Sequence, residues 1–466
     1  MKKTLRQTFI GDRAFYAMVL AVAVPIMIEN GITNFVNMLD NIMIGRVGTA
    51  QMSGVAIVNQ LIYVFYLCLF GGLSGPGIFT AQFFGNHDLE GVRSAFRFKL
   101  WLGTLVCAAA VCILSFFGTP LISQFLNGDS SELGATLEAA QQYLRVMLLG
   151  LPAFALCRIY GGTLRECGQT LLPMKAGVAA VLVNLVLNYI LIYGKLGFPA
   201  LGVTGAAIAT VISRYVEVLI VLVWTHTHTR DLPFIAGLYR TLRVPGDLVR
   251  RIIVKGFPLL ANEALWSTAQ TTLVQCYSLR GLEAVAAINI ANIIGNVLNV
   301  VFFAMGDAVA IIVGQQLGAG NMEKARDYDN KLIAFGVFTG ILTACAMMIV
   351  SPFFPKIYNT TPEIQALAGS LIRILGAFIP TFAFLHCTYF TLRAGGRTII
   401  TFCFDCVFAW VVSVSLAYTL AHFTDMPITG MLAIVRASDL IKCVIGAVLV
   451  YKGVWLRRFV DSDERG

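Results

Sequence analysis

The feature that most constrains this chain is a series of long apolar runs separated by short loops. The first run covers residues 15–44, and others of similar length follow to the end of the chain. A membrane-spanning helix needs about 20 mostly apolar residues. Lipid offers no partner for backbone hydrogen bonds, so such runs must cross the membrane as helices or as a closed barrel. Because the runs are continuous rather than alternating, they predict an all-α integral membrane protein.

Length and composition support this class. Hydrophobic residues make up 58% of the 466 residues and charged residues 13%, whereas soluble domains carry about 25% charged residues. We expect twelve transmembrane helices, near residues 15–44, 52–80, 94–117, 137–162, 171–194, 202–224, 254–279, 286–316, 330–352, 367–392, 398–421 and 429–452.

The net charge of +9 fits an orientation signal better than nucleic-acid binding. Basic residues collect in alternate loops, including the loops of Arg93, Arg165 and Arg393, as the positive-inside rule describes. This pattern predicts a multi-pass protein of the inner (plasma) membrane with both termini in the cytoplasm. The expected partners are membrane lipids and small molecules, with no nucleic acid.

The two halves of the chain repeat one another. An offset of 233 positions (258 − 25) aligns Pro25 with Pro258. Without a gap, the same offset pairs Gln82 with Gln315 and Gly85 with Gly318, and a later one pairs Thr163-Leu164-Arg165 with Thr391-Leu392-Arg393. Six spans in each copy predict two pseudo-symmetric six-helix lobes, residues 1–235 and 236–466, related by an axis along the membrane normal.

Polar side chains follow one face of several predicted spans. In the first span Asn30, Asn34, Asn37 and Asn41 recur at helical spacing, with Thr33 and Asp40 beside them. A charge within the membrane is costly and almost always faces a bundle interior or a wet cavity. Other spans carry Asn184 and Asn188, Thr210, Glu263 and Gln270, Asn292 and Asn296, and Asp405.

We interpret these stripes as the lining of a substrate cavity formed by Asn34, Asn37, Glu263, Gln270, Asn292, Asn296 and Asp405. Simple helix-to-helix hydrogen bonding is the alternative for the amides. Asp40 and Glu263 lie at different depths of matching spans, which suggests that one half couples to a cation and the other helps to bind cargo. Arg214 with Glu217, and Arg436 with Asp439, are spaced for ion pairs on one helix.

No pattern indicates an enzyme. The sequence has no P-loop, so ATP is not expected to supply the energy. We expect no cofactor beyond a coupling ion.

Four segments resemble the MATE (multidrug and toxic compound extrusion) family of the MOP flippase superfamily. They are LDNIMIGRVGT from Leu39, IIVGQQLGAGN from Ile311, NLVLNYILIYGKLGFPALGVTGAAIAT from Asn184 and TLRAGGRT from Thr391. The resemblance covers essentially the whole chain. It implies the MATE fold and an antiporter, here expected to be a monomer, that exports organic cations or amphipathic compounds by alternating access in exchange for Na⁺ or H⁺.

The resemblance also implies a cation site in the N-terminal lobe. Carried onto this sequence, the site consists of Asp40, Asn184, Asn188 and Thr210, with Asp40 as the metal ligand if the ion is Na⁺. Two alternatives remain open. One is a lipid-linked oligosaccharide flippase of the same superfamily, and the other is a passive channel or membrane receptor.

Overall fold

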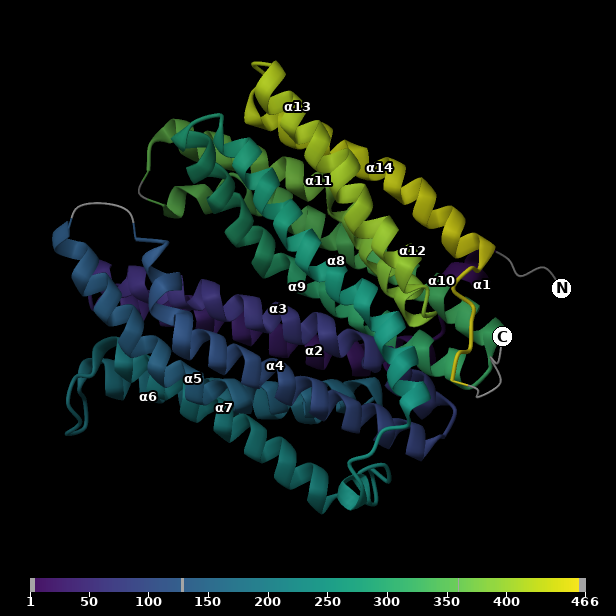
Figure 1. Ribbon diagram of the computed structural model, residues 1–466. Helices are drawn as coiled ribbons and strands as arrows, with labels where there is room; N and C mark the ends of the chain where they lie inside the picture. The colour runs from purple at the N-terminus through teal and green to yellow at the C-terminus, as the bar shows by residue number, and fades with distance from the viewer. Residues whose placement is uncertain (1–4, 127–129, 359, 461–466) are drawn as a thin grey trace. The chain divides into compact units, whose positions relative to one another are not determined.

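The computed structural model describes residues 5–126, 130–358 and 360–460. Within these residues the chain forms twelve long helical segments and no strand (Figure 1). The segments are α2 (Arg13–Gly45), α3 (Thr49–Gly85), α4 (Leu89–Ser123), α5 (Ser130–Glu166), α6 (Leu171–Tyr193), α7 (Gly202–Thr227), α8 (Gly246–Ser278), α9 (Leu282–Gly318), α10 (Met322–Val350), α11 (Pro362–Ala394), the segment Thr398–Phe423 and α14 (Ile428–Lys452). Every predicted span falls on one of them, which confirms the all-α class.

Ten of these helices are long and apolar enough to cross a membrane by composition alone, among the residues that were described. The other two, α8 and α14, have 33 and 25 residues. They carry more charge, including Glu263 on α8 and Asp439 on α14. Charged residues within membrane helices almost always face the interior of the helix bundle or a water-filled cavity, so we expect these charges to face inward.

The segment Thr398–Phe423 is one continuous helix whose central turns are π-helical. It begins as α12 (Thr398–Phe402), continues through π-helical turns η3 (Cys403–Val407) and η4 (Ala409–Val414), and ends as α13 (Ser415–Phe423). Such π turns are rare and often occur at functional sites. Asp405 lies on the first of them.

Packing divides the chain into two units. The C-terminal unit contains Met1–Met27, Ala81–His87 and Ile253–Gly466, and the N-terminal unit contains Ile28–Thr80 and Asp88–Ile252. The predicted division at residue 235 follows the repeat, whereas this grouping assigns the first half of α2 to the C-terminal unit. The change of unit within α2 falls shortly after Pro25, where a helix interior loses a backbone hydrogen bond.

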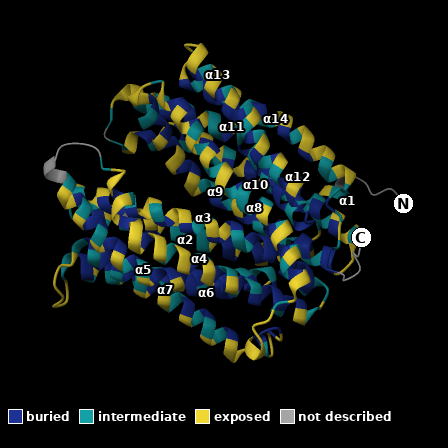
Figure 2. Cartoon of the chain, in the orientation of Figure 1, coloured by how far each residue is buried: buried dark blue, intermediate teal, exposed yellow. Residues whose placement is uncertain are grey.

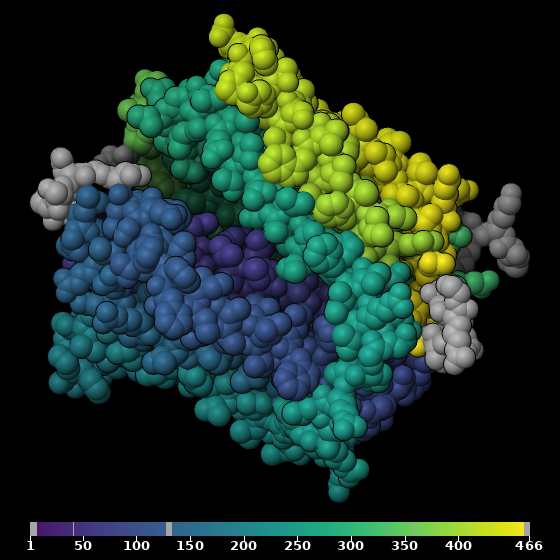
Figure 3. Space-filling view, in the orientation of Figure 1, coloured from purple at the N-terminus to yellow at the C-terminus, as the bar shows by residue number. Residues whose placement is uncertain are grey.

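In the N-terminal unit, α7 packs against α5 and α6, and α4 packs against α5 (Figure 1). Its core includes Val58, Ile62 and Leu151. Large apolar side chains such as Leu105 and Phe116 of α4 are exposed, and in Figure 2 exposed residues recur along the helices beside buried ones. In Figure 3 the blue side chains of α4 and α5 form a continuous surface of this unit. Exposed apolar side chains on a span are expected where it meets lipid.

In the C-terminal unit, two pairs of residues that the sequence repeat aligns are in close contact. A Cβ atom added to Gly85 would overlap the carbonyl oxygen of Gln315, and one added to Gly318 would overlap that of Gln82. These four residues are the pairs that the offset of 233 aligns. The end of α3 and the end of α9 therefore cross at a close, reciprocal contact that requires glycine on both sides.

Candidate functional site

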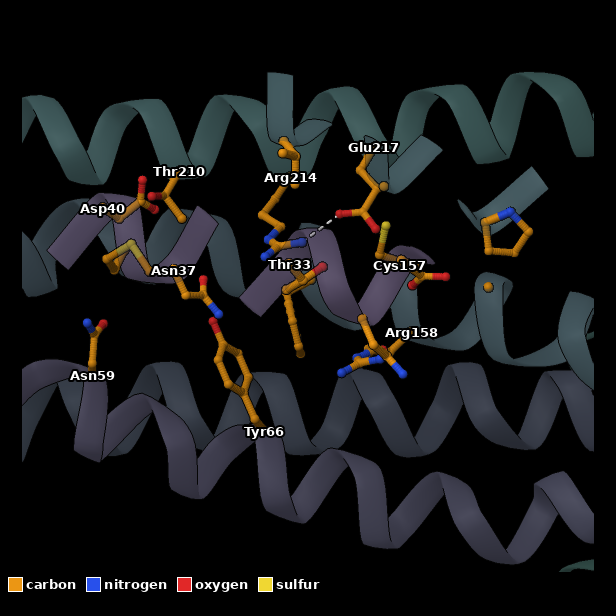
Figure 4. A pocket seen from close by; sticks show the side chains of 18 of the residues that line it. Thr33, Asn37, Asp40, Asn59, Tyr66, Cys157, Arg158, Thr210, Arg214 and Glu217 are labelled. Carbon is orange, nitrogen blue, oxygen red and sulfur yellow. Dashed lines mark hydrogen bonds and ion pairs between the residues drawn. The ribbon is translucent and has the colours of Figure 1, made fainter. Parts of the chain in front are cut away.

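The N-terminal unit encloses a cavity of about 450 Å³, which lies in the usual range for small-molecule sites (Figure 4). Its walls come from α2, α3, α5, α6 and α7. On α2 the polar residues Asn30, Thr33, Asn37 and Asp40 line the cavity and recur at steps of three and four, and Glu29 and Ile44 also line it. One face of a continuous helix therefore lines the cavity, and it overlaps the predicted polar stripe in part.

Asp40 lies at one end of this cavity, and the structure brings its predicted partners to it. The Nδ2 atom of Asn188 donates to Oδ1 of Asp40 at 2.6 Å and to Oδ1 of Asn184 at 3.1 Å. Nδ2 of Asn184 donates to Oγ1 of Thr210 at 3.3 Å. The four residues that the family resemblance grouped are thus joined by hydrogen bonds, from α2, α6 and α7.

Several oxygen atoms gather at this end. In the orientation just described, the amide oxygen of Asn184 accepts a hydrogen bond from Asn188 but also faces both carboxylate oxygens of Asp40. If the amide is turned over, its nitrogen lies 3.1 and 3.2 Å from the two carboxylate oxygens. Oδ1 of Asn188 is buried and has no hydrogen-bond partner among the described residues. The amide oxygens of Asn184 and Asn188 and the carboxylate oxygens of Asp40 could coordinate a bound cation, and a proton on Asp40 could be shared between neighbouring oxygens.

The other end of the cavity is basic, which sequence reasoning missed. Arg165 forms an ion pair with Glu29, and Arg214 forms one with Glu217 at 2.7 Å. Arg158 also lines the cavity. Arg165 was expected as an orientation signal and gate contact at the cytoplasmic edge, and the Arg214–Glu217 pair was predicted correctly but not placed in a cavity. A lone base within the apolar run of α5 was a usable signal for Arg158.

The first-helix stripe reaches the cavity only in part. Asn37 lines it, but Asn34 is exposed and lies outside the lining, where Thr33 is found instead. The side chain of Asn41 lies outside those that the structure describes. The face of α2 that lines the cavity is therefore centred closer to Thr33 and Asp40 than to Asn34.

In the C-terminal unit, predicted residues belong to a polar network. Lys442 donates from Nζ to Oδ1 of Asp405 at 2.7 Å, and Nδ2 of Asn262 donates to Oδ2 of Asp405 at 3.2 Å. Nδ2 of Asn262 lies 3.3 Å from the hydroxyl of Tyr389, which in turn donates to Oε1 of Glu263 at 3.2 Å. Glu263 and Asp405 are thus brought together through Asn262 and Tyr389.

The remaining predicted residues of this unit are not drawn into that network. Asn292 and Asn296 of α9 are exposed, and Gln270 of α8 is half-buried. The contact of Lys442 with Asp405 was not predicted from the sequence. On α14, Arg436 lies 3.9 Å from Asp439, as predicted.

Comparison with known proteins shows which family has this sequence pattern. The family model MatE matches residues 25–190 and 258–419, one segment in each half of the repeat. The chain is 25% identical over 452 residues to a probable multidrug resistance protein NorM of Thermotoga maritima, covering 96% of this chain and 94% of that one. It is also 25% identical over 417 residues to the multidrug resistance protein PmpM of Pseudomonas aeruginosa, covering 88% and 84%.

Solved structures agree with the fold. A variant of the Vibrio cholerae MATE transporter VcmN superposes with a TM-score of 0.85 at 16% identity, covering 95% of this chain and 97% of that one. A MATE crystal structure in a bent conformation gives a TM-score of 0.82 at 21% identity, covering 97% and 98%. Because the family model matches well over half of the sequence, in both halves, the chain belongs to the MatE family.

Proposed function

We propose that this protein exports small amphipathic or cationic compounds across the inner (plasma) membrane in exchange for Na⁺ or H⁺. The family membership and the multidrug resistance names of NorM and PmpM support export. The proposal places both termini in the cytoplasm, which the distribution of basic loops supports, and treats the transporter as a monomer.

The observation that carries this proposal is the setting of Asp40. Its carboxylate lies in a cavity of about 450 Å³ beside the amides of Asn184 and Asn188 and the hydroxyl of Thr210. No basic side chain forms an ion pair with Asp40 among the described residues, so its charge is available to a cation. Na⁺ would use the carboxylate, amide and hydroxyl oxygens of this group, whereas H⁺ would bind the carboxylate alone.

Coupling follows if the ion and the cargo stabilise different conformations. A ligand shifts a conformational equilibrium only by as much as its affinities for the two states differ. Binding of a cation at Asp40 would neutralise the acidic end of the cavity and change its affinity for a cationic cargo. Release of that ion on the other side of the membrane would restore the cavity.

The test uses purified protein in proteoliposomes loaded with a fluorescent cationic dye, under separately imposed Na⁺ and proton gradients. We expect dye accumulation against its gradient with one of the two ions, and its loss when an ionophore dissipates that gradient. Asp40→Asn should abolish this uphill transport, while Asp231→Asn, an exposed linker residue, should not. Full uphill transport by Asp40→Asn would contradict the proposal.

A passive channel or receptor would move dye only down its gradient, so the same assay separates that class from an antiporter. The flippase alternative has one observation in its favour, since Arg158, Arg165 and Arg214 make one end of the cavity basic. A lipid-linked sugar carries a pyrophosphate that needs such groups. Transport of the dye with ion dependence would favour the exporter.

A further inference from the structure

Charges in the cavity of the N-terminal unit are sorted along its length. Asp40 and Glu29 lie on the same helix eleven residues apart, which corresponds to about 16 Å of helix. Around Asp40 the neighbours are amides and hydroxyls. Farther along, Arg214 lies between Thr210 and Glu217, and Arg158 lies beyond it (Figure 4). Arg165 also lines the cavity, where it is paired with Glu29.

Two of the three arginines already have carboxylate partners. Arg165 is paired with Glu29 and Arg214 with Glu217. Arg158 has no hydrogen bond and no ion pair among the described residues, and its side chain is exposed while lining the cavity. This end of the cavity therefore presents one guanidinium whose charge nothing on the protein neutralises by direct contact.

An aromatic surface lies beside that guanidinium. The Cζ atom of Arg158 is 5.3 Å from the ring centroid of Phe154, and that of Arg214 is 5.7 Å from the same ring. Tyr66 stacks on Phe154 with ring centroids 4.0 Å apart. Stacking on a ring fixes the plane of a guanidinium and leaves its N–H groups directed outward for hydrogen bonds.

We propose that Arg158, supported by Arg214 and the Phe154–Tyr66 pair, forms a subsite for one anionic group, a carboxylate or a phosphate, carried on an aromatic or otherwise apolar molecule. The guanidinium binds the anion through paired N–H donors, and the rings contact the apolar part of the molecule. This inference depends on the proposed function only because it concerns the same cavity. It adds that the cargo of this chain is not limited to cations.

The first experiment measures binding without any ion gradient, so its result stands even if transport fails. The probes are a fluorescent rhodamine with a free carboxylate and its methyl ester, which differ only in the anionic group. With wild-type protein in detergent we expect the acid to bind more tightly than the ester. In Arg158→Gln the ratio of the two affinities should fall by about 10-fold or more, the size of a charge-assisted hydrogen bond.

Two further variants control for folding and for charge. Arg158→Lys keeps a cation and should retain part of the preference for the acid. Arg145→Gln removes the same charge from the same helix at an exposed position outside the cavity lining, and should behave as wild type. An affinity ratio that is the same in wild type, Arg158→Gln and Arg145→Gln would count against a carboxylate ligand.

The second experiment asks whether the anion is a lipid phosphate. Nanodiscs would contain fluorescent phosphatidate or phosphatidylcholine, and energy transfer from the protein would report lipid held at the site. Loss of phosphatidate binding in Arg158→Gln, with phosphatidylcholine unaffected, supports the subsite with a lipid as its source. If Arg158→Gln changes neither the rhodamine ratio nor the phosphatidate signal, the proposal is wrong.

Discussion

Asp40 in the N-terminal unit and Asp405 in the C-terminal unit are both carboxylates on membrane helices, and their partners differ. Asp40 accepts a hydrogen bond from Asn188 and has no ion pair among the described residues, whereas Asp405 is paired with Lys442 at 2.7 Å. The repeat has therefore kept the scaffold of both halves but left only one of these two acids available to an external cation.

The same divergence occurs in the last helix of each repeat. An offset of 225 (429 − 204) aligns Thr204 with Thr429, and it also pairs Arg214 with Asp439 and Glu217 with Lys442. Charges at matching positions have thus opposite signs in the two halves. In the first half they form an ion pair on one helix, and in the second Lys442 reaches Asp405 on another helix.

The largest predicted effect on stability comes from breaking the C-terminal pair. Lys442→Met removes the ammonium and leaves Asp405 without its cation, and loss of one member of a buried pair costs about 3–5 kcal/mol. Because this pair is only partly buried, we expect a loss near the lower end of that range, about 3 kcal/mol, which thermal unfolding in detergent measures. The double change K442M with D405N should recover most of it. Asp40→Asn should lower Tm far less than Lys442→Met does. If the two variants lose the same amount in Tm, the contrast between the two halves is wrong.

A smaller effect is expected where the repeats cross in the C-terminal unit. Gly318→Ala places a Cβ against the backbone of Gln82, and the resulting shift should cost about 1–3 kcal/mol. Gly85→Ala should cost a similar amount, because its contact with Gln315 is the reciprocal one. Gly134→Ala, with open space around it, is the control for the unfolding measurement. A wild-type Tm for Gly318→Ala would show that the close approach is not needed.

The smallest effect concerns the link between Glu263 and Asp405. Tyr389→Phe removes the hydroxyl that joins Glu263 to Asn262, at a cost of about 1 kcal/mol. Tyr143→Phe in the N-terminal unit breaks only a 3.4 Å contact with Asn59 and should cost less. The same thermal unfolding series ranks the two, and the reverse order would argue against an integrated network in the C-terminal unit.

Much of the fold could be predicted from the sequence because the membrane imposes length and apolarity on every span. All twelve predicted spans fall on long helices, most with ends a few residues longer. The paired glycines of the repeat were visible as an ungapped match. What hydropathy could not predict is the grouping of the first half of α2 with the C-terminal unit, which depends on packing of residues such as Phe15 and Val19.

The candidate site was predictable where a pattern lies on one helix and was not where contacts join distant helices. Asp40 stands out as a charge in an apolar run. Thr33 and Asn34 flank the face of Asn30, about 60° to one side and about 40° to the other, so helical spacing alone did not show which of the two faces the cavity. Arg158 was not predicted, because a single base in an apolar run has no repeating pattern that places it on a cavity face. The Lys442–Asp405 pair joins residues 37 apart on different helices, a separation that no helical period can reveal.

We expect Asp40, and not the C-terminal network, to couple cargo to the ion. Gradient-driven dye accumulation in proteoliposomes by Asp40→Asn and by the double variant K442M D405N tests it most directly. We predict that Asp40→Asn loses uphill accumulation while the double variant, once shown to be folded, retains it. Uphill accumulation that survives in Asp40→Asn and disappears in the double variant would contradict the account.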